Sequence, residues 1–295
     1  MTFARQRRLF LILMGLPATV YVAAVAGGPV AQGVWYSFFD YNLQRPARRR
    51  FVGLDNYAAL WADDGTRAAI GNTFAFTIAA VGLEFMCGLV LALLLWRDSR
   101  FNRAAVALML VPVTLTPLVV GLTFRGLLNA DFGLLGYYLR TWNFSDHGLL
   151  AGRWTALPTL VAIDVWEWTP LVALILLAGL KTVPVELVEA ARIDGASGWQ
   201  RLWSVVLPTM LPAVLLALVL RSMDAFRVFD SVFATTQGGP ADATTTLMFQ
   251  AVKTGLSFFD IGYAEAISNL MIACLAVLAA GFALLIRGAN RRLHG

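Results

Sequence analysis

Long uninterrupted apolar runs dominate the chain. The first extends from Leu9 to about Phe39 without a charged residue, and five others cover about 70–96, 104–128, 157–180, 208–233 and 266–286. Each run is long enough for a membrane-crossing α-helix, which needs roughly 20 apolar residues. The pattern predicts an all-α integral membrane protein with six transmembrane helices and both termini on one side of the membrane.

These runs divide the chain into consecutive segments. We expect an N-terminal tail at 1–8, a first transmembrane helix at 9–39, an extracytoplasmic loop at 40–69, a five-helix core at 70–287 and a C-terminal tail at 288–295. A cleavable signal peptide is the alternative for the first run, since Arg7 and Arg8 precede it and Ala24–Ala26 resembles a cleavage site. The run is too long for a signal peptide and continues past that point, so we expect an uncleaved helix.

Composition agrees with a membrane protein. Hydrophobic residues make up 59% of the 295 residues and charged residues 14%, and the mean hydropathy is +0.69. A soluble domain carries about 25% charged residues, so a soluble fold could not cover this much apolar surface. A soluble enzyme, a nucleic-acid-binding domain and a disordered scaffold are thereby excluded. Lys and Arg favour cytoplasmic termini, except for the cluster Arg45–Arg50, which would lie outside.

The loop between the fourth and fifth runs, at 184–208, predicts two short helices joined by a turn. Pro184 suits the first turn of a helix, and Gly195 is placed to end that helix in a left-handed conformation. Ser197 followed by Gln200 is typical of a capping box that begins a second helix, and Pro208 is expected to open the next span. An ordinary amphipathic loop on the membrane surface is the alternative.

The same loop resembles the EAA loop of ABC importer permeases. The resemblance rests on a long fixed spacing from Glu189-Ala190-Ala191 through Gly195 to Leu207-Pro208. It implies a cytoplasmic helix-turn-helix that couples to an ATP-hydrolysing subunit, and it therefore places both termini inside. The implied coupling residues are Glu189, Ala190, Ala191, Asp194, Gly195, Leu207 and Pro208.

A second stretch resembles the carbohydrate-uptake permeases of the maltose, trehalose and glycerol-phosphate type. It comprises Asp224–Asp230, Thr236–Pro240 and Thr244–Leu247, whereas Glu265 stands where that family usually has a small residue. The resemblance implies a bacterial inner membrane location and a second homologous permease. It also implies an ATP-binding subunit dimer that holds ATP and Mg, an extracytoplasmic sugar-binding protein, a carbohydrate substrate and surrounding lipid. No nucleic acid is expected.

Ionisable residues inside the spans are costly, so each needs a partner or a water-filled cavity. Asp164 and Glu167 share a helix face, and Trp166 and Trp168 flank them. Carboxylates beside indole rings suit a sugar, whose hydroxyls need acceptors and whose C–H faces need apolar cover. A structural ion pair of Glu167 with Arg221 is the alternative. The resemblance implies substrate contacts at the positions Asp164, Glu167, Trp168 and Leu171.

The fifth run carries two further charged pairs. Arg221 and Asp224 share one helix face, and Arg227 and Asp230 would lie about 240° further around the helix. We expect the first pair to face the pocket and the second to brace the outer end of the helix. Glu84, alone in the second run, is expected to be paired rather than functional.

Other chemistry is not indicated. The chain has no G-x-x-x-x-G-K-[ST] phosphate loop, so ATP chemistry would belong to a partner. No catalytic constellation is present, the two histidines His147 and His294 do not suggest a metal site, and Cys87 and Cys274 are expected to be buried core residues. An ion-coupled secondary carrier would also place carboxylates mid-membrane, but it predicts inverted repeats that we do not find. A membrane enzyme ranks below it.

The predicted function is that of a permease subunit in an ATP-driven sugar importer. A glucose disaccharide such as trehalose or maltose is the favoured substrate. Glycerol 3-phosphate is the alternative, since Arg221 and Arg227 would suit its phosphate. Exposed candidates for contact with the binding protein are Arg45–Arg50, Asp55 and the Gly238–Thr246 loop, each of which could equally be a solvated loop.

Overall fold

The computed structural model describes residues 3–142 and 148–294. Within these residues four helices are long and apolar enough to cross a membrane, and the number rises to six if each of two bent helix pairs is one span. The strands that are described form a two-stranded sheet. The prediction of an all-α membrane protein is confirmed. His147 lies outside the described residues.

The chain forms two compact units, Met1–Asp63 with Ala251–Met271, and Asp64–Gln250 with Ile272–Gly295. The first unit begins with a helical run made of α1 (Phe3–Val22), a π-helical turn and α2 (Gly28–Tyr36). Strand β1 (Phe39–Asp40) pairs antiparallel with β2 (Arg50–Phe51), and α3 (Asp55–Ala62) follows. The helical run ends at Tyr36, three residues before the predicted boundary.

A side-chain contact at Gly33 and a polar cluster join the helices of the first unit. A Cβ added at Gly33 in α2 would lie 2.5 Å from a carboxylate oxygen of Glu265, in the first part of α15 (Ile261–His294), so the Glu265 side chain packs directly against the backbone of α2. The Tyr57 hydroxyl of α3 lies 2.7 Å from the Ser37 hydroxyl and accepts a hydrogen bond from the Asn269 amide at 3.1 Å. These contacts join α2, α3 and α15.

Asp260 lies directly before α15, in a partly desolvated position. Burial raises the pKa of Asp260, and the nearby carboxylate of Asp40 adds to this rise. The backbone N–H of Tyr263 donates to Asp260 at 3.1 Å and lowers the pKa, but less than burial raises it. The Asp260 carboxyl group therefore caps α15, and its neutral form favours the folded state of the protein.

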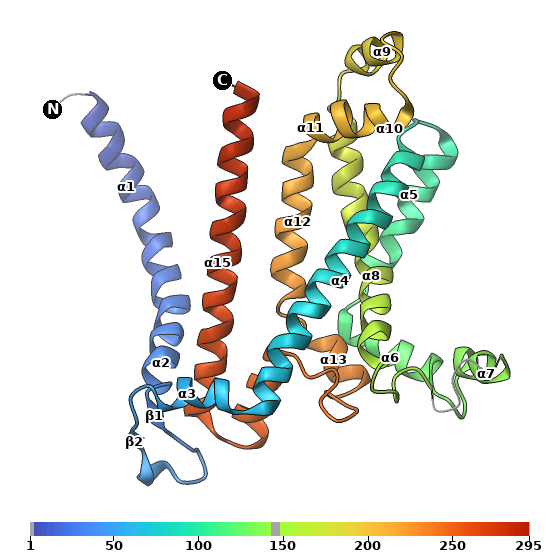
Figure 1. Ribbon diagram of the computed structural model, residues 1–295. Coiled ribbons are helices and arrows are strands. Elements are labelled where there is room, and N and C mark those ends of the chain that lie inside the picture. Colours follow the sequence, from blue (N-terminus) through green and yellow to red (C-terminus); the bar gives the residue numbers. More distant parts are fainter. Residues whose placement is uncertain (1–2, 143–147, 295) are drawn as a thin grey trace. The chain divides into compact units, whose positions relative to one another are not determined.

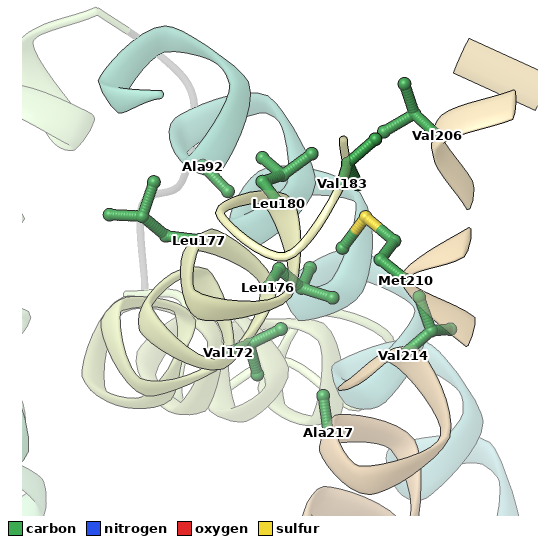
Figure 2. Packing of buried hydrophobic residues seen from close by; sticks show 10 residues of the cluster. All are labelled: Ala92, Val172, Leu176, Leu177, Leu180, Val183, Val206, Met210, Val214 and Ala217. Atoms are coloured by element: carbon green, nitrogen blue, oxygen red, sulfur yellow. The ribbon is translucent and has the colours of Figure 1, made fainter. Parts of the chain in front are cut away.

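The second unit is built on α4 (Asp64–Leu95), α8 (Ala156–Leu180) and α12 (Leu211–Ala225), which pack against one another (Figure 1). A Cβ added at Gly88 of α4 would lie 2.9 Å from a methyl group of Val172 in α8. Small residues of this kind allow membrane helices to approach closely. Figure 2 shows the apolar cluster between α8 and the α12 region: Ala92, Val172, Leu176, Leu177, Leu180, Val183, Val206, Met210, Val214 and Ala217.

The third apolar run forms two helices instead of one. Helix α5 (Arg100–Val113) and helix α6 (Pro117–Leu127) are bent by 89° relative to each other. Pro117 lacks an N–H to continue the preceding helix, and Pro112 weakens its last turn. Helix α7 (Leu134–Thr141) follows, and α6 packs on α13 (Asp230–Thr235), where a Cβ added at Gly121 would lie 2.6 Å from Ala234.

The fifth run is also divided. Helix α9 (Val185–Ile193) is followed by α10 (Gly198–Arg201), a π-helical turn and α11 (Leu207–Thr209), and a bend of 75° then leads into α12. Pro208 lies before this bend, so the prediction that it opens the span is wrong: α12 begins at Leu211, with Pro212 in its first turn. Helix α14 (Leu247–Val252) precedes the π-helical segment Lys253–Ser257 that leads to α15.

Candidate functional site

Arg221 is the centre of a buried charge network that joins three helices. Its Nε donates to Glu84 Oε2 at 2.7 Å and its Nη2 to Glu84 Oε1 at 2.8 Å. Nη2 also donates to Asp164 Oδ2 at 2.8 Å, and Nη1 donates to Asp224 Oδ2 at 2.6 Å. The side chains of Arg221 and Glu84 are 2% and 0% exposed, that of Asp164 is 5% exposed, and that of Asp224 is 48% exposed. We call these four residues the Arg221 network.

The network confirms one expectation and corrects another. Glu84 is paired, as predicted, and its partner is Arg221 on α12. The alternative pair of Glu167 with Arg221 is wrong, because Glu84, Asp164 and Asp224 occupy the guanidinium donors instead. Glu167 is fully buried, and both of its carboxylate oxygens lack a hydrogen-bond partner among the described residues.

A pocket of about 450 Å³ opens beside the network. It brings together four of the residues predicted for the substrate path, and the Arg221 guanidinium carbon lies 4.7 Å from the centre of the Trp168 ring. A smaller adjoining pocket of about 100 Å³ includes Asp164, whereas Glu167 lines neither, so its assignment to the substrate path stays a prediction. The larger pocket is lined by Trp168, Leu171, Leu220, Arg221, Met223, Asp224, Arg227 and Leu275.

Trp166 faces away from this pocket. Its ring packs edge-to-face against Phe124 at 5.3 Å, and it lines a separate apolar hollow with residues of α4 and α5. Two residues along a helix turn the side chain by about 200°, so Trp166 and Trp168 cannot cover the same ligand. Pro170 lies inside α8 without ending it. Only Trp168 of the two indoles is therefore available to the pocket.

Arg227 shares the pocket with Arg221, contrary to the prediction from helix rotation. Helix α12 ends at Ala225, so Arg227 lies in a connection rather than on a continuing helix. Its Nη2 lies 3.7 Å from Asp224 Oδ1, and Nε donates to the Met223 carbonyl at 3.3 Å. No ion pair of Arg227 with Asp230 occurs among the described residues, since Asp230 already belongs to α13.

The 184–208 loop has the predicted local geometry. Gly195 has a φ of +82°, and no atom lies within 4 Å of a Cβ built there, so the backbone angle alone requires glycine. The Ser197 backbone N–H donates to Gln200 Oε1 at 2.7 Å, and the Gln200 N–H donates back to Ser197 Oγ at 3.3 Å. This reciprocal pair confirms the capping box. Pro184 is the N-cap of α9 rather than part of its first turn.

Both helices of this loop present exposed side chains. Glu189, Ala190, Asp194 and Gly195 are exposed, and Ala191 is half-buried. The predicted coupling residues Leu207 and Pro208 lie in α11, at the other end of the loop. Val206, directly before them, belongs to the apolar cluster of α8 and α12. The part of the loop around α9 is therefore exposed, whereas its end at Val206 is packed into the apolar cluster.

The predicted exposed loop at Gly238–Thr246 is largely buried. Thr244, Thr245 and Thr246 are fully buried, and the Thr246 hydroxyl donates to the Val228 carbonyl at 3.0 Å. The Asn72 amide of α4 donates to the Thr245 carbonyl at 3.0 Å. A threonine hydroxyl and an asparagine amide thus satisfy backbone carbonyls here. Between 236 and 246 only residues 237, 241 and 242 are exposed.

The arginine cluster, in contrast, is exposed. Arg45, Arg48 and Arg50 lie on the surface of the hairpin region, and Asp55 is exposed as well. Arg49 places its guanidinium carbon 4.2 Å from the centre of the Phe39 ring, with the rings of Tyr36 and Tyr41 also nearby. A further polar hollow of about 430 Å³ is lined by Asp40, Asn42, Gln44, Arg45 and Arg48.

The possible metal ligands and the two cysteines lie as follows. No group of three His, Cys, Asp or Glu residues in the described part of the chain could hold a metal ion. The prediction that both cysteines are buried is wrong: Cys87 is exposed on α4, and Cys274 on α15 is half-buried. An exposed apolar side chain is ordinary on a helix that faces lipid, so the apolar run around Cys87 does not by itself indicate burial.

Residues 84–294 match the family described as binding-protein-dependent transport system inner membrane component. The trehalose transport system permease protein SugA of Mycobacterium tuberculosis is 34% identical over 274 residues, which cover 93% of this chain and 87% of that protein. The trehalose/maltose permease MalF of Thermococcus litoralis is 34% identical over 258 residues, covering 88% and 87%. The sn-glycerol-3-phosphate permease UgpA of Yersinia enterocolitica is 30% identical over 265 residues, covering 88% of each protein.

The fold is similar to that of a solved bacterial alginate ABC transporter chain, with a TM-score of 0.77 at 20% identity, covering 98% of this chain and 96% of that chain. The chain belongs to the binding-protein-dependent transport system inner membrane component family. It is a membrane permease of the ABC importer class, a transport subunit and not an enzyme.

Proposed function

We propose that the chain forms one half of the translocation path of a bacterial inner-membrane sugar importer. A second homologous permease would supply the other half, a dimer of ATP-binding subunits would bind ATP and Mg, and an extracytoplasmic sugar-binding protein would deliver the substrate. Similarity over most of the chain to sugar permeases supports this assembly. Both termini and the 184–208 loop would then lie in the cytoplasm.

The proposed substrate is a neutral glucose disaccharide such as trehalose or maltose. The main observation in favour of a neutral substrate is the neutralisation of Arg221. Three carboxylates lie within hydrogen-bond distance of its guanidinium and offset its positive charge. The pocket then offers the Trp168 ring as an apolar platform and Asp224 as a half-exposed acceptor. An aromatic face with carboxylate acceptors matches the C–H faces and hydroxyls of a sugar.

Glycerol 3-phosphate remains the second candidate, because UgpA is among the relatives. Its phosphate carries about −1.5 to −2 charge at neutral pH and needs unpaired cationic donors. Arg221 lacks that capacity, since four hydrogen bonds already engage its guanidinium. Arg227 lies beside Asp224, whose charge would repel a dianion. The geometry therefore favours the neutral sugar.

We further propose that the 184–208 loop couples the permease to ATP hydrolysis. The exposed face of α9 around Glu189 would dock on the ATP-binding subunit, and closure of that subunit dimer would displace the loop. The small side chains of Ala190 and Ala191 would permit close approach of the partner. On the other side of the membrane, Arg45–Arg50 and Asp55 would contact the binding protein, since both are exposed.

Reconstitution of the complete importer in liposomes tests this function. ATP-dependent uptake of labelled trehalose or maltose, with glycerol 3-phosphate transported at least about tenfold more slowly, is expected. Preference for glycerol 3-phosphate would reverse the substrate choice. Uptake by this chain alone, driven by an ion gradient without ATP-binding subunits, would instead establish the secondary-carrier alternative.

A further inference from the structure

We propose that Glu84 is a positioning residue for the substrate pocket. It lies on α4, is fully buried and is not part of the pocket lining. It acts through Arg221, which in turn contacts two side chains that line the pocket, the carboxylate of Asp224 and the ring of Trp168. This inference rests on the proposed sugar-transport function, but the geometry it describes can be measured without any sugar.

Glu84 binds Arg221 through two hydrogen bonds. Each carboxylate oxygen of Glu84 accepts a separate bond, from Nε at 2.7 Å and from Nη2 at 2.8 Å. A bidentate pair of this kind fixes the plane of the guanidinium as well as its position. Asp164 accepts only one bond, at 2.8 Å, about which the guanidinium could still turn. Glu84 is therefore the group that sets the orientation of Arg221.

The oriented guanidinium contacts two side chains that line the pocket, Asp224 and Trp168. Its remaining nitrogen, Nη1, donates to Asp224 Oδ2 at 2.6 Å, and its carbon lies 4.7 Å from the centre of the Trp168 ring. Asp224 is half-exposed and its other oxygen lies 3.7 Å from Arg227, so it has an alternative partner if Arg221 turns. Glu84 thereby fixes an acceptor on α12 and a ring on α8 at once.

Glu84 itself has no direct role in binding the sugar, since it is fully buried and does not line the pocket. A fully buried carboxylate whose two oxygens are both used by Arg221 has little capacity left for a sugar hydroxyl. Replacement by glutamine keeps the size but turns one acceptor into an NH₂ donor, which cannot accept from the guanidinium. Glu84→Gln should therefore allow the guanidinium plane of Arg221 to turn, while none of the pocket-lining residues is itself substituted.

The experiment measures the accessibility of the pocket with a reporter cysteine introduced at Met223, one of the pocket-lining residues. The full importer is prepared with Cys87→Ser, Cys274→Ser and Met223→Cys, and the assembled complex is isolated by size. The rate of labelling by a water-soluble methanethiosulfonate is measured without sugar. The trehalose concentration that halves this rate is then determined.

In the Glu84→Gln complex we expect the sugar-free labelling rate to rise and the half-protecting trehalose concentration to increase about tenfold, the effect of one lost oriented contact. Glu84→Asp keeps the charge but reaches only one nitrogen, so it should shift both readouts in the same direction by less. Glu265→Gln, which removes a carboxylate from α15 outside the Arg221 network, is the matched control and should change neither.

Wild-type labelling and protection in assembled Glu84→Gln and Glu84→Asp complexes would overturn the positioning role. If Glu84→Gln fails to assemble, the Glu84→Asp complex decides the question by the same two readouts. Absence of trehalose and maltose protection in the parent complex would count against the proposed substrate instead. The sugar-free labelling rates would still test Glu84 in that case.

Discussion

Replacing Arg221 with methionine removes the only cation that contacts Glu84 and Asp164 among the described residues, while preserving most of the side-chain volume. Those two carboxylates are almost completely buried. Breaking a buried ion pair by removing one partner costs about 3–5 kcal/mol, because the other charge stays desolvated. Two buried carboxylates depend on Arg221, so we expect the free energy of unfolding to fall by about 5 kcal/mol; Asp224 is half-exposed and adds little.

The free energy of unfolding is measured by denaturant titration of the detergent-solubilised importer, with tryptophan fluorescence as the signal. The triple variant Glu84→Gln, Asp164→Asn, Arg221→Met is the internal comparison. It removes the orphaned charges and should recover part of the loss, since a buried amide costs less free energy than a buried unpaired carboxylate. An Arg221→Met variant within about 1 kcal/mol of wild type, or a triple variant no more stable than the single one, would refute the reasoning.

Three further outcomes follow from particular positions. Gly88→Ala places a Cβ 2.9 Å from a methyl group of α8 and should cost about 1–3 kcal/mol in thermal unfolding, whereas Gly71→Ala meets nothing within 4 Å and should not. Gly195→Val strains a φ of +82° and should uncouple ATP hydrolysis from uptake while the complex still assembles; unchanged uptake, or an equal loss in Gly198→Val, would contradict this. The pKa of Asp260 is raised on folding, so protonation of its carboxyl group stabilises the folded state. This stabilisation is lost as the pH rises through the raised pKa, and the melting temperature should fall with it. Asp260→Asn should abolish that pH dependence of the melting temperature, and an unaltered profile would contradict the prediction.

Much of the architecture follows from local sequence pattern. Apolar runs longer than the bilayer thickness predict the helices because a lipid environment leaves the backbone few alternatives. The turn at Gly195 and the capping box at Ser197 are predictable because each depends on residues within four positions. These features need no knowledge of what the rest of the chain does.

The prediction for Arg227 was wrong because it depends on where α12 ends. Pattern alone continues the fifth helix through Arg227, and this places Arg227 on the wrong face. The structure ends α12 at Ala225, and the Thr246 hydroxyl donates to the carbonyl of Val228 in the connection that follows. A contact with a residue that is distant along the chain leaves no signal in the periodicity around the helix end.

The partner of Glu84 could not be predicted for a similar reason. Glu84 and Arg221 are 137 residues apart, Arg227 could also have paired with Glu84, and four other carboxylates in the spans could have paired with Arg221. The cost of a buried charge requires that some partner exists but does not say which. Only the packing of α4 against α8 and α12 selects Arg221, with Asp164 as the second acceptor.

The same packing connects the pocket to the proposed coupling loop. Val206 and Met210, at the end of the loop, lie in one apolar cluster with Leu176 and Leu180 of α8. Helix α8 continues from that cluster to Trp168, and α12 continues from it to the Arg221 network. Packed interiors transmit displacement because they contain few voids that could absorb it. A movement of α9 by the ATP-binding subunit would therefore reach both walls of the pocket through continuous helices, and the two-point bond of Glu84 would keep those walls in register.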